Sequence, residues 1–588
     1  MKPVVDILEK RISDAMTVAT GQENCSAIVK PAADPKFGDY QANGVMALAK
    51  KLKNNPRKLA EQIVEKLDLT DICDEPEIAG PGFINLRLKP GFLASSLLEI
   101  NAEPENMAVE KLEHAETVVV DFSGPNIAKQ MHVGHLRSTI IGDCICRILE
   151  FLGHNVIRQN HIGDWGTQFG MLIAWLKQES PQVIDNSESV HIGDLEQFYK
   201  NAKALCDEDA DFAESARKEV TKLHNHDQQT LTVWQHIVDE SRRHYQPIYE
   251  TLGVGLHKEN ERGESFYAEK LSGVVGELEN KNIAEESDGA VCVFPEGFKN
   301  KDDEPLPFII RKSDGAFLYA TTDLAALQYR INELKVKRII YVTDARQKLH
   351  FEMLFASAKM AGWVGDDIAL SHVMFGMVLG EDNRPFKTRS GENVKLSDLL
   401  AEAVDRARQI VQEKNPELST EQKDNIANAV GIGAVKYADY SNNRTSDYIF
   451  SYDRMLAMEG NTAPYMQYAY ARIKSIERKA QTKDVDIETE LADLDKLSLT
   501  ESAELDLAKY LVRYGEVIRS VVDDYRPNYL TQYLYELAQK FSTFYTNCPV
   551  LIAEPDKRPT RLLLCDLTAR TIKHGLTKLL GIEVVEQM

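Results

Sequence analysis

The chain contains the stretch Asp121-Phe-Ser-Gly-Pro-Asn-Ile-Ala-Lys-Gln-Met-His-Val-Gly-His-Leu-Arg-Ser-Thr139, and this stretch decides its fold. The β-branched run at 117–120 predicts a buried strand. The run breaks at Ser-Gly-Pro-Asn, and we expect an amphipathic helix from near His135 to about Phe151, ended by Gly153. Unpaired N–H groups and the helix dipole both favour an anion at such a strand-loop-helix junction. The pattern therefore predicts a nucleotide phosphate site.

Two imidazoles and one lysine lie near the start of that helix. His132, His135 and Lys129 would supply hydrogen-bond donors and positive charge where a phosphate gains charge during transfer. Gly134 would let the nucleotide approach the backbone closely. We therefore expect the nucleotide site to be catalytic.

Two other interpretations of the histidines stay open. A pair three residues apart could be half of a metal site, but no nearby cysteine or histidine cluster completes a tetrahedral set. We accordingly expect no metal held by the protein itself. The histidines could also be structural residues that only pack.

His-x-Gly-His at a strand-to-helix turn is the signature of class I aminoacyl-tRNA synthetases. The longer run Pro125-Asn126-Ile-Ala-Lys129, followed by Met131-His132-Val-Gly-His135-Leu-Arg-Ser-Thr139, closely resembles the bacterial arginyl-tRNA synthetases. The resemblance implies an arginine–tRNA ligase that uses L-arginine, tRNA(Arg) and ATP with Mg²⁺. It implies ATP contacts from Pro125, Lys129, His132, Gly134 and His135.

Composition is compatible with that resemblance and limits the alternatives. The chain has 588 residues, of which 43% are hydrophobic, enough for several domains with cores of their own. No apolar run is long enough to cross a bilayer, and the N-terminus is not a signal peptide. Eight cysteines without a C-x-x-C pair indicate buried thiols in a reducing compartment, so we expect a cytoplasmic protein without a membrane partner.

The net charge of −22 argues against nucleic acid at long range, because an acidic protein repels phosphate. Acidic chains still bind RNA through local basic or aromatic surfaces. The net charge therefore does not exclude tRNA as a partner. The sequence does not fix the oligomeric state, and we expect a monomer.

The order of predicted elements indicates an α/β protein with three domains. Residues 1–110 alternate helix and strand and resemble the N-terminal additional domain of the family, which contacts the tRNA elbow. Residues 111–455 alternate strands and helices as a doubly wound parallel sheet, the Rossmann-type catalytic domain, requires. A polar stretch at about 180–265 interrupts this domain and predicts a helical insertion. Residues 456–588 have helical period throughout and resemble an all-α anticodon-binding domain.

Three further segments fit a site at the same sheet edge. A short strand is expected before His161-Ile-Gly-Asp164, Tyr319 and Asp323 lie one helical turn apart, and Gln347 follows a strand at 338–342. A guanidinium has five fixed donors and needs carboxylate and carbonyl acceptors in a rigid frame. The resemblance implies arginine binding by Asp121, Asn126, Tyr319, Asp323 and Gln347. On the motif alone, Asp323 could equally cap a helix while Tyr319 packs.

The second synthetase signature is degenerate in this chain. Its nearest match is Phe386-Lys387-Thr-Arg389-Ser-Gly391, where Arg389 or Ser390 replaces the second lysine. In arginyl enzymes a lysine just before the histidine motif is thought to supply the missing charge, and Lys129 occupies that place. The sequence does not decide which of Lys129, Lys387 and Arg389 dominates. The segment could instead be an ordinary basic surface turn.

The resemblance implies tRNA contacts for Phe83, Asn85 and Met588, and we expect Tyr465 to contact tRNA because its ring can stack on a base. Tyrosines at 465, 468 and 470 suit stacking on unpaired bases, although at helical spacing they could belong to a core. Two rival functions stay open: a synthetase for lysine or glutamine, and a catalytically inactive tRNA-binding relative. The amino acid that drives ATP–pyrophosphate exchange would separate them.

Overall fold

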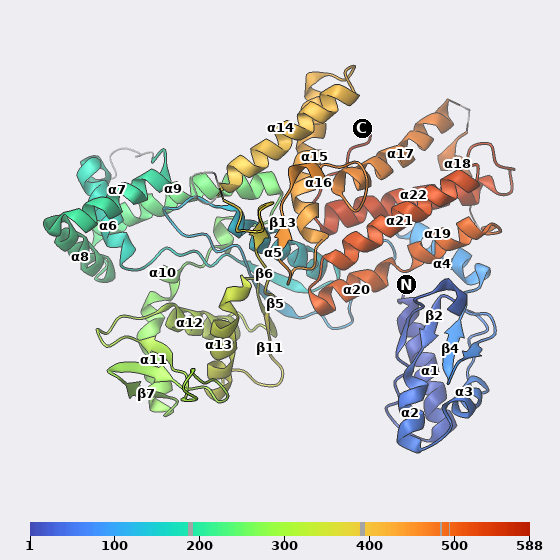
Figure 1. The fold of residues 1–588 in the computed structure, drawn as a ribbon, viewed down its shortest axis with the longest axis horizontal. Coiled ribbons are helices and arrows are strands. Elements are labelled where there is room, and N and C mark those ends of the chain that lie inside the picture. Colours follow the sequence, from blue (N-terminus) through green and yellow to red (C-terminus); the bar gives the residue numbers. More distant parts are fainter. Residues whose placement is uncertain (186–191, 388–393, 483–484, 493, 495) are drawn as a thin grey trace. The chain divides into compact units, whose positions relative to one another are not determined.

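The computed structural model describes residues 1–588 except 186–191, 388–393, 483–484, 493 and 495 (Figure 1). The chain forms two compact units by its internal contacts, one made of Met1–Leu112 with Leu456–Met588 and the other of Glu113–Met455. The predicted division into three domains stays a prediction. Across the described ranges, no helix has the length and apolar character that a bilayer crossing requires.

The unit Glu113–Met455 is built on a parallel sheet. Within its described residues the strands follow the order β11-β10-β5-β6, with bounds β5 Thr117–Asp121, β6 Asn155–Gln159, β10 Arg338–Tyr341 and β11 Ala369–His372. Helix α5, Val133–Phe151, connects β5 to β6, and helix α13, Lys348–Met360, connects β10 to β11. These two crossovers run in opposite directions along the sheet, so right-handed connections place α5 and α13 on opposite faces. The doubly wound α/β prediction is confirmed.

The strand order reverses between β5 and β10, and ligands bind at the carboxyl ends of strands beside such a reversal. Asp121 ends β5 and is level with Gln159 on one side and Tyr341 on the other. A hydrophobic core that includes Val119 and Ile339 lies between the sheet and α11 (Leu271–Asn280), α12 (Tyr319–Asn332) and α13. The packed sheet therefore presents a fixed edge to the site.

Helices and short strands complete this unit. The region predicted as a helical insertion contains α7, α8 and α9 (Figure 1). Before the second signature segment, β11 ends at His372 and the separate β12 follows at Val378–Leu379. The remaining bounds are α6 Gln168–Glu179, α7 Leu195–Glu208, α8 Ala210–His224, α9 Gln228–Leu252, α10 Glu264–Tyr267, β7 Ala284–Ser287, β8 Ala290–Val293, β9 Phe308–Arg311, β12 Val378–Leu379, α14 Leu396–Lys414, α15 Thr420–Tyr440, β13 Tyr448–Ile449 and α16 Tyr452–Met455.

The other unit joins the two ends of the chain. Its antiparallel sheet has the order β1-β2-β4-β3, and its C-terminal part is helical. The bounds are α1 Val4–Thr20, β1 Val29–Pro31, β2 Tyr40–Ala42, α2 Gly44–Leu52, α3 Pro56–Val64, β3 Glu77–Ala79, β4 Phe83–Leu86, α4 Pro90–Ala102, α17 Ala463–Gln481, α18 Ile487–Ala492, α19 Ser502–Val512, α20 Tyr514–Asp524, α21 Asn528–Asn547 and α22 Arg558–Lys573.

A buried hydrogen bond links the two parts of this unit. The Tyr40 hydroxyl donates to Glu516 Oε1 at 2.6 Å, and the backbone N–H of Val5 donates to the same oxygen at 3.0 Å. Burial raises the pKa of Glu516, while these hydrogen bonds and Arg513 favour its charged form. The N-terminal segment is thus attached to α20 through one buried carboxylate.

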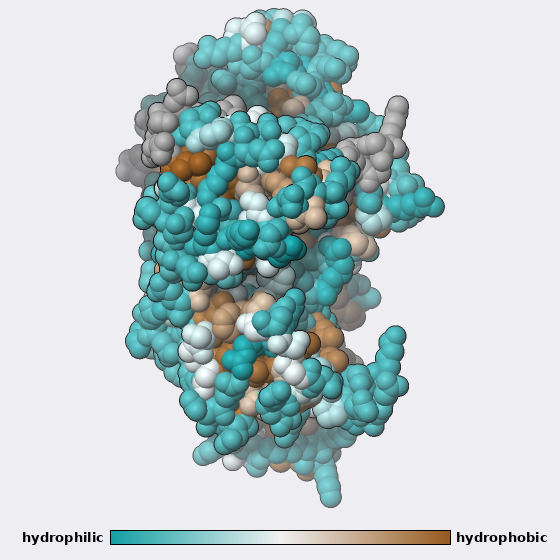
Figure 2. All heavy atoms as spheres, turned by 90° about the vertical axis from the view of Figure 1, so that its left-hand side faces the viewer, coloured by the Kyte–Doolittle hydropathy of each residue, from teal (hydrophilic) through white to brown (hydrophobic). Residues whose placement is uncertain are grey.

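The surface that the molecule presents in Figure 2 is mostly hydrophilic, and hydrophobic side chains show chiefly in gaps between hydrophilic ones. That distribution agrees with a chain of which 27% is charged. Apolar surface that is exposed in small pieces is normal for a folded protein and by itself marks no binding face.

Candidate active site

The loop after β5 is held in an irregular conformation by side chains around it. Ser123 and Ala128 both have positive φ values, 74° and 58°. The Ser123 backbone N–H donates to Ser138 Oγ at 2.9 Å, and the Ser123 and Tyr249 hydroxyls share a hydrogen bond at 2.7 Å. The Ala128 N–H donates to Ser241 Oγ at 3.0 Å. The loop that carries the signature residues is therefore fixed from several sides.

The two signature histidines accept hydrogen bonds at the start of α5. The Gly134 N–H donates to Nδ1 of His132 at 3.0 Å, and the His132 N–H donates to Nδ1 of His135 at 3.1 Å. Their ring centroids are 4.1 Å apart. Because each Nδ1 accepts, a neutral ring must carry its proton on Nε2. Both Nε2–H groups are thus available as donors to an anion.

The same histidines are kept neutral by their surroundings. Burial, with a contribution from His132, lowers the pKa of His135 to about 3. Burial and the charges of Arg346 and Lys129 also lower the pKa of His132. At neutral pH the pair therefore supplies neutral donors, and the positive charge must come from other residues.

Gly134 is required for a reason that the sequence did not reveal. A Cβ at this position would lie 2.7 Å from Cε1 of His132, closer than real Cβ contacts allow. Any larger residue would displace the imidazole that caps the helix. The structure therefore gives Gly134 a role in seating His132, in addition to the predicted approach of a nucleotide.

Carboxylates also line the site, and Asp323 and Glu264 together form what we call its acidic wall. Asp323 lies inside α12, and its Oδ2 is 2.6 Å from Nε2 of His350 on α13. It does not cap the helix, so that alternative is wrong. Glu264, which sequence reasoning missed, lies at the start of α10 in the same wall. Burial, followed by the negative charges of Asp164 and Asp323, raises the pKa of Glu264 to about 8. No local pattern marks Glu264, because its neighbours in space are distant in sequence.

These side chains line one cavity of about 550 Å³. It brings together eight of the predicted residues: Asp121, Asn126, His132, Gly134, His135, Tyr319, Asp323 and Gln347. Phosphate-type donors therefore lie at one end of α5, and acidic acceptors project from α10 and α12. Such a cavity suits a ligand that has an anionic part and a cationic part.

Three family models match consecutive parts of the chain. The catalytic domain of class I tRNA synthetases (R) matches residues 99–452, the N-terminal domain of arginyl-tRNA synthetase matches residues 6–88, and the DALR anticodon-binding domain matches residues 466–588. An arginine–tRNA ligase from Nostoc punctiforme is 52% identical over 594 residues, covering 100% of both chains. The chain belongs to the class I arginyl-tRNA synthetases.

Further relatives agree with this assignment. An arginine–tRNA ligase from Hahella chejuensis is 50% identical over 585 residues and covers 99% of both chains. The crystal structure of an arginyl-tRNA synthetase from Plasmodium falciparum is 32% identical, covers 100% of both chains and has a TM-score of 0.85. The predicted resemblance is thereby confirmed.

The second synthetase signature lies partly outside the described residues. Arg389 is among the residues that the structure leaves undescribed, and Lys387 is exposed just before them. The segment that follows is bound to the histidine turn: the Val133 N–H donates to the Val394 carbonyl at 3.0 Å, and the Leu396 N–H donates to the Met131 carbonyl at 2.9 Å. The histidine turn is therefore joined through the backbone to residues 394–396, which follow the second signature segment.

Two other predicted nucleotide residues do not line the cavity. Pro125 is buried, and its carbonyl accepts from the Gly163 N–H at 3.2 Å. Lys129 is exposed, with Nζ 4.8 Å from the centroid of the Tyr199 ring. The ATP contacts predicted for these residues stay predictions.

The residues predicted to contact tRNA belong to the other unit. Asn85 is only 4% exposed, and its Oδ1 accepts from Gln41 Nε2 at 2.8 Å. Phe83 and Met588 are partly exposed, and the Tyr465 ring lies 5.6 Å from that of Tyr535. Tyr470 is 2% exposed and belongs to the core. The tRNA contacts stay predictions.

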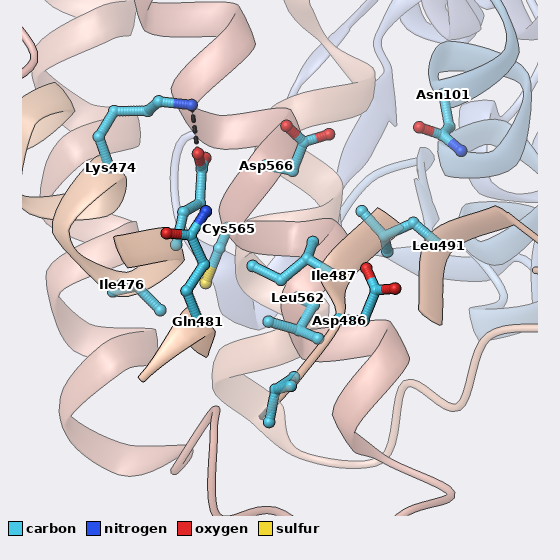
Figure 3. Close-up of a pocket in the computed structure, with 12 residues that line it drawn as sticks. Asn101, Lys474, Ile476, Gln481, Asp486, Ile487, Leu491, Leu562, Cys565 and Asp566 are labelled. Carbon is cyan, nitrogen blue, oxygen red and sulfur yellow. Dashed lines mark hydrogen bonds and ion pairs between the residues drawn. The ribbon is translucent and has the colours of Figure 1, made fainter. Parts of the chain in front are cut away.

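That unit contains a larger cavity, of about 1020 Å³, between α4, α17, α18 and α22 (Figure 3). Its lining mixes apolar and charged side chains. Lys474 is paired with Glu477, and Asp566 accepts from Arg570, so these charges have partners inside the protein. The cavity lacks the donor-acceptor arrangement of the smaller one, so the smaller cavity at the histidine turn is the candidate active site.

Proposed function

We propose that this chain attaches arginine to tRNA(Arg) in two steps. The arginine carboxylate attacks the α-phosphorus of ATP, the bond to the β-phosphate oxygen breaks, and arginyl-adenylate and pyrophosphate form. A ribose hydroxyl of the terminal adenosine of tRNA then attacks the activated carbonyl, and AMP leaves. One observation carries the proposal: two neutral imidazoles at a helix N-terminus share one cavity with Asp323 and Glu264.

The imidazoles act on the phosphate. The Nε2–H groups of His132 and His135 donate to the α-phosphate oxygens as negative charge accumulates in the transition state. Their proximity to the N-terminus of α5 adds the favourable field of the helix dipole. Lys129, with Lys387 and Arg389, supplies the positive charge that stabilises the departing pyrophosphate. ATP enters as its Mg²⁺ complex, a substrate in which the phosphates themselves hold the ion.

The acidic wall selects the amino acid. A planar guanidinium pairs with two carboxylates through fixed, charge-assisted hydrogen bonds. Asp323 and Glu264 are suited to that role because both line the cavity near each other. A lysine ammonium would leave part of this acceptor set unpaired, which costs about 1–3 kcal/mol for each buried group. The remaining groups of arginine are bound by Asp121, Asn126, Tyr319 and Gln347.

The unit formed by the two chain ends would bind the rest of the tRNA. The matches to an arginyl-tRNA synthetase N-terminal domain and to an anticodon-binding domain support this role. We propose elbow contacts from Phe83 and Asn85 and anticodon contacts from Tyr465 and Met588. We also propose that the enzyme works as a cytoplasmic monomer.

Arginine-dependent ATP–pyrophosphate exchange, measured with and without tRNA(Arg), tests the proposal. We expect exchange with arginine when tRNA is present, little exchange without it, and no exchange with lysine or glutamine. Exchange driven by lysine or glutamine would overturn the choice of substrate. Absence of exchange with every amino acid, from enzyme that still binds tRNA, would favour an inactive tRNA-binding relative.

A further inference from the structure

The helical insertion holds the backbone of the loop that carries Lys129. Its long helix α9 supplies Ser241, which accepts from the Ala128 N–H at 3.0 Å. Ser241 is 1% exposed, and Ala128 has a positive φ of 58°, so this contact fixes a conformation that most residues avoid. The residue just before Lys129 therefore has its geometry set by the insertion.

A second helix of the insertion contacts the Lys129 side chain. The ammonium nitrogen lies 4.8 Å from the centroid of the Tyr199 ring on α7. The same ammonium is close enough to His132 to lower the pKa of that imidazole. The charge of Lys129 therefore lies at the Tyr199 ring and also influences His132.

Helix α7 is itself tied to the histidine turn. Asp194 caps its N-terminus by accepting from the backbone N–H groups of Glu196 and Gln197, and its carboxylate lies 3.8 Å from Lys395 Nζ. Lys395 in turn pairs with His132 in an antiparallel backbone bridge. Helix α7, which carries Tyr199, is therefore connected through Asp194 and Lys395 to the segment that contains His132.

We propose that Tyr199 is a positioning residue for Lys129, and that the insertion thereby sets the place of the cation that stabilises departing pyrophosphate. The proposal rests on the proposed role of Lys129. An exposed lysine has many rotamers, and an aromatic face restricts them while leaving the ammonium partly hydrated. The ring thus reduces the conformational freedom that Lys129 would lose when the phosphates bind.

The expected effect is modest and specific. A cation–π contact at an exposed site contributes about 0.5–1 kcal/mol, which corresponds to roughly a two- to fivefold change in rate. We expect Tyr199→Leu to lower kcat for arginine- and tRNA-dependent ATP–pyrophosphate exchange by that factor, with the KM for arginine unchanged. Tyr199→Phe keeps the aromatic face and should retain most of the activity.

A double-mutant cycle with Lys129→Met separates positioning from packing. Tyr199→Leu should have no further effect once Lys129 is methionine, because the interaction it removes is already lost. Phe198→Leu is a matched control: it makes the same kind of exchange one residue away, at a ring that is 9% exposed. Its effect should be equal in both backgrounds.

The outcomes distinguish the proposal from the function on which it rests. An equal loss from Tyr199→Leu in both backgrounds, an unchanged rate, or a loss as large with phenylalanine would each overturn the positioning role. Wild-type exchange by Lys129→Met would instead overturn the role of Lys129 itself. Failure of arginine to support exchange in the unmodified enzyme would overturn the proposed function.

Discussion

Arg330 on α12 donates from Nη2 to Oδ2 of Asp121 at 2.6 Å, directly beneath the cavity. It also donates from Nε to Gln159 at 2.7 Å, and its guanidinium carbon lies 5.0 Å from the centroid of the Tyr341 ring. These three partners are level with one another on β5, β6 and β10. Arg330 thus links the ends of β5, β6 and β10. It also partly neutralises the Asp121 carboxylate, which we propose binds substrate.

Replacing Arg330 should destabilise the catalytic unit. Arg330→Met leaves the Asp121 carboxylate, whose side chain is 13% exposed, without its cation, and breaking a fully buried pair in this way costs about 3–5 kcal/mol, which sets the upper limit here. Urea unfolding followed by tryptophan fluorescence would measure the loss. Arg346→Met is the control, because Arg346 pairs with Asp344 but is 77% exposed, so its loss should cost no more than about 1 kcal/mol. Equal costs would contradict the bracing role.

Arginine binding should release a proton near neutral pH. The pKa of Glu264 is about 8 in the empty site, so this carboxyl is largely protonated at pH 7. A bound guanidinium favours the charged form, and affinity for arginine should therefore rise as pH increases toward 8, by at most about tenfold per pH unit, and then level off. Titration calorimetry in buffers of different ionisation enthalpy would measure how many protons are released for each arginine bound.

Two variants sharpen that measurement. Glu264→Gln should weaken arginine binding and remove the pH dependence, because no carboxyl is left to titrate. Glu269→Gln changes a nearby glutamate that is 84% exposed and should leave both affinity and pH dependence unchanged. Persistence of the pH dependence in Glu264→Gln would assign the proton to another group.

The ring of His135 should stay neutral throughout the working range of the enzyme. Its pKa of about 3 predicts no titration of its ring signals in NMR spectra between about pH 5 and 8. The unfolded chain takes up this proton near pH 6.5, whereas the folded protein does so only near pH 3. The free energy of unfolding should consequently fall as the pH is lowered from about 6.5 to about 3. A titration of the ring near pH 6.5 would contradict this.

Removing the donor of His135 should slow activation without loosening tRNA. His135→Ala takes away a contact that we propose is made to the transition state, and such donors contribute roughly 10²–10³ in rate. We expect the exchange rate to fall by about that factor while tRNA affinity, measured by filter binding, stays unchanged. His114→Ala alters an exposed histidine in the same unit and should affect neither quantity.

Tyr40→Phe should loosen the unit formed by the chain ends. The exchange removes a 2.6 Å hydrogen bond to the buried Glu516, at a cost of about 1–3 kcal/mol. Hydrogen exchange should accelerate in α1 and α20 together. Tyr468→Phe, at a tyrosine that is 43% exposed, should leave exchange unchanged. Acceleration confined to one of the two helices would contradict a shared support.

Local sequence signals predicted the structural frame of the site well. The β-branched run became β5, and the break after it was followed by α5, which ends at Phe151 as expected and begins at Val133, two residues before the expected start near His135. These elements depend on residues close in sequence, whose propensities and end signals act independently of the rest of the fold.

The partners inside the site could not be predicted in this way. Glu264 is influenced by the charges of Asp164 and Asp323, and Arg330 and Ser241 contact residues more than a hundred positions away. Nothing in the local sequence around these three residues marks them. The role of Gly134 in seating His132 likewise needed the orientation of a ring. For Asp121, Tyr319 and Gln347, family resemblance and not physical chemistry led to the cavity. Contacts between residues that are distant in sequence determine these arrangements. The periodicity of hydrophobic residues along the chain carries no information about such contacts.

The hydrogen bonds between residues 131–133 and residues 394–396 matter for the design of inhibitors. A compound that displaces residues 394–396 would have to break the backbone hydrogen bonds beside His132. It would therefore disturb the imidazoles that we propose as phosphate donors without competing for their ligand. Substitutions within residues 131–133 or 394–396 that confer resistance to such a compound would also impair catalysis. A pathogen enzyme of this family should therefore tolerate few of them.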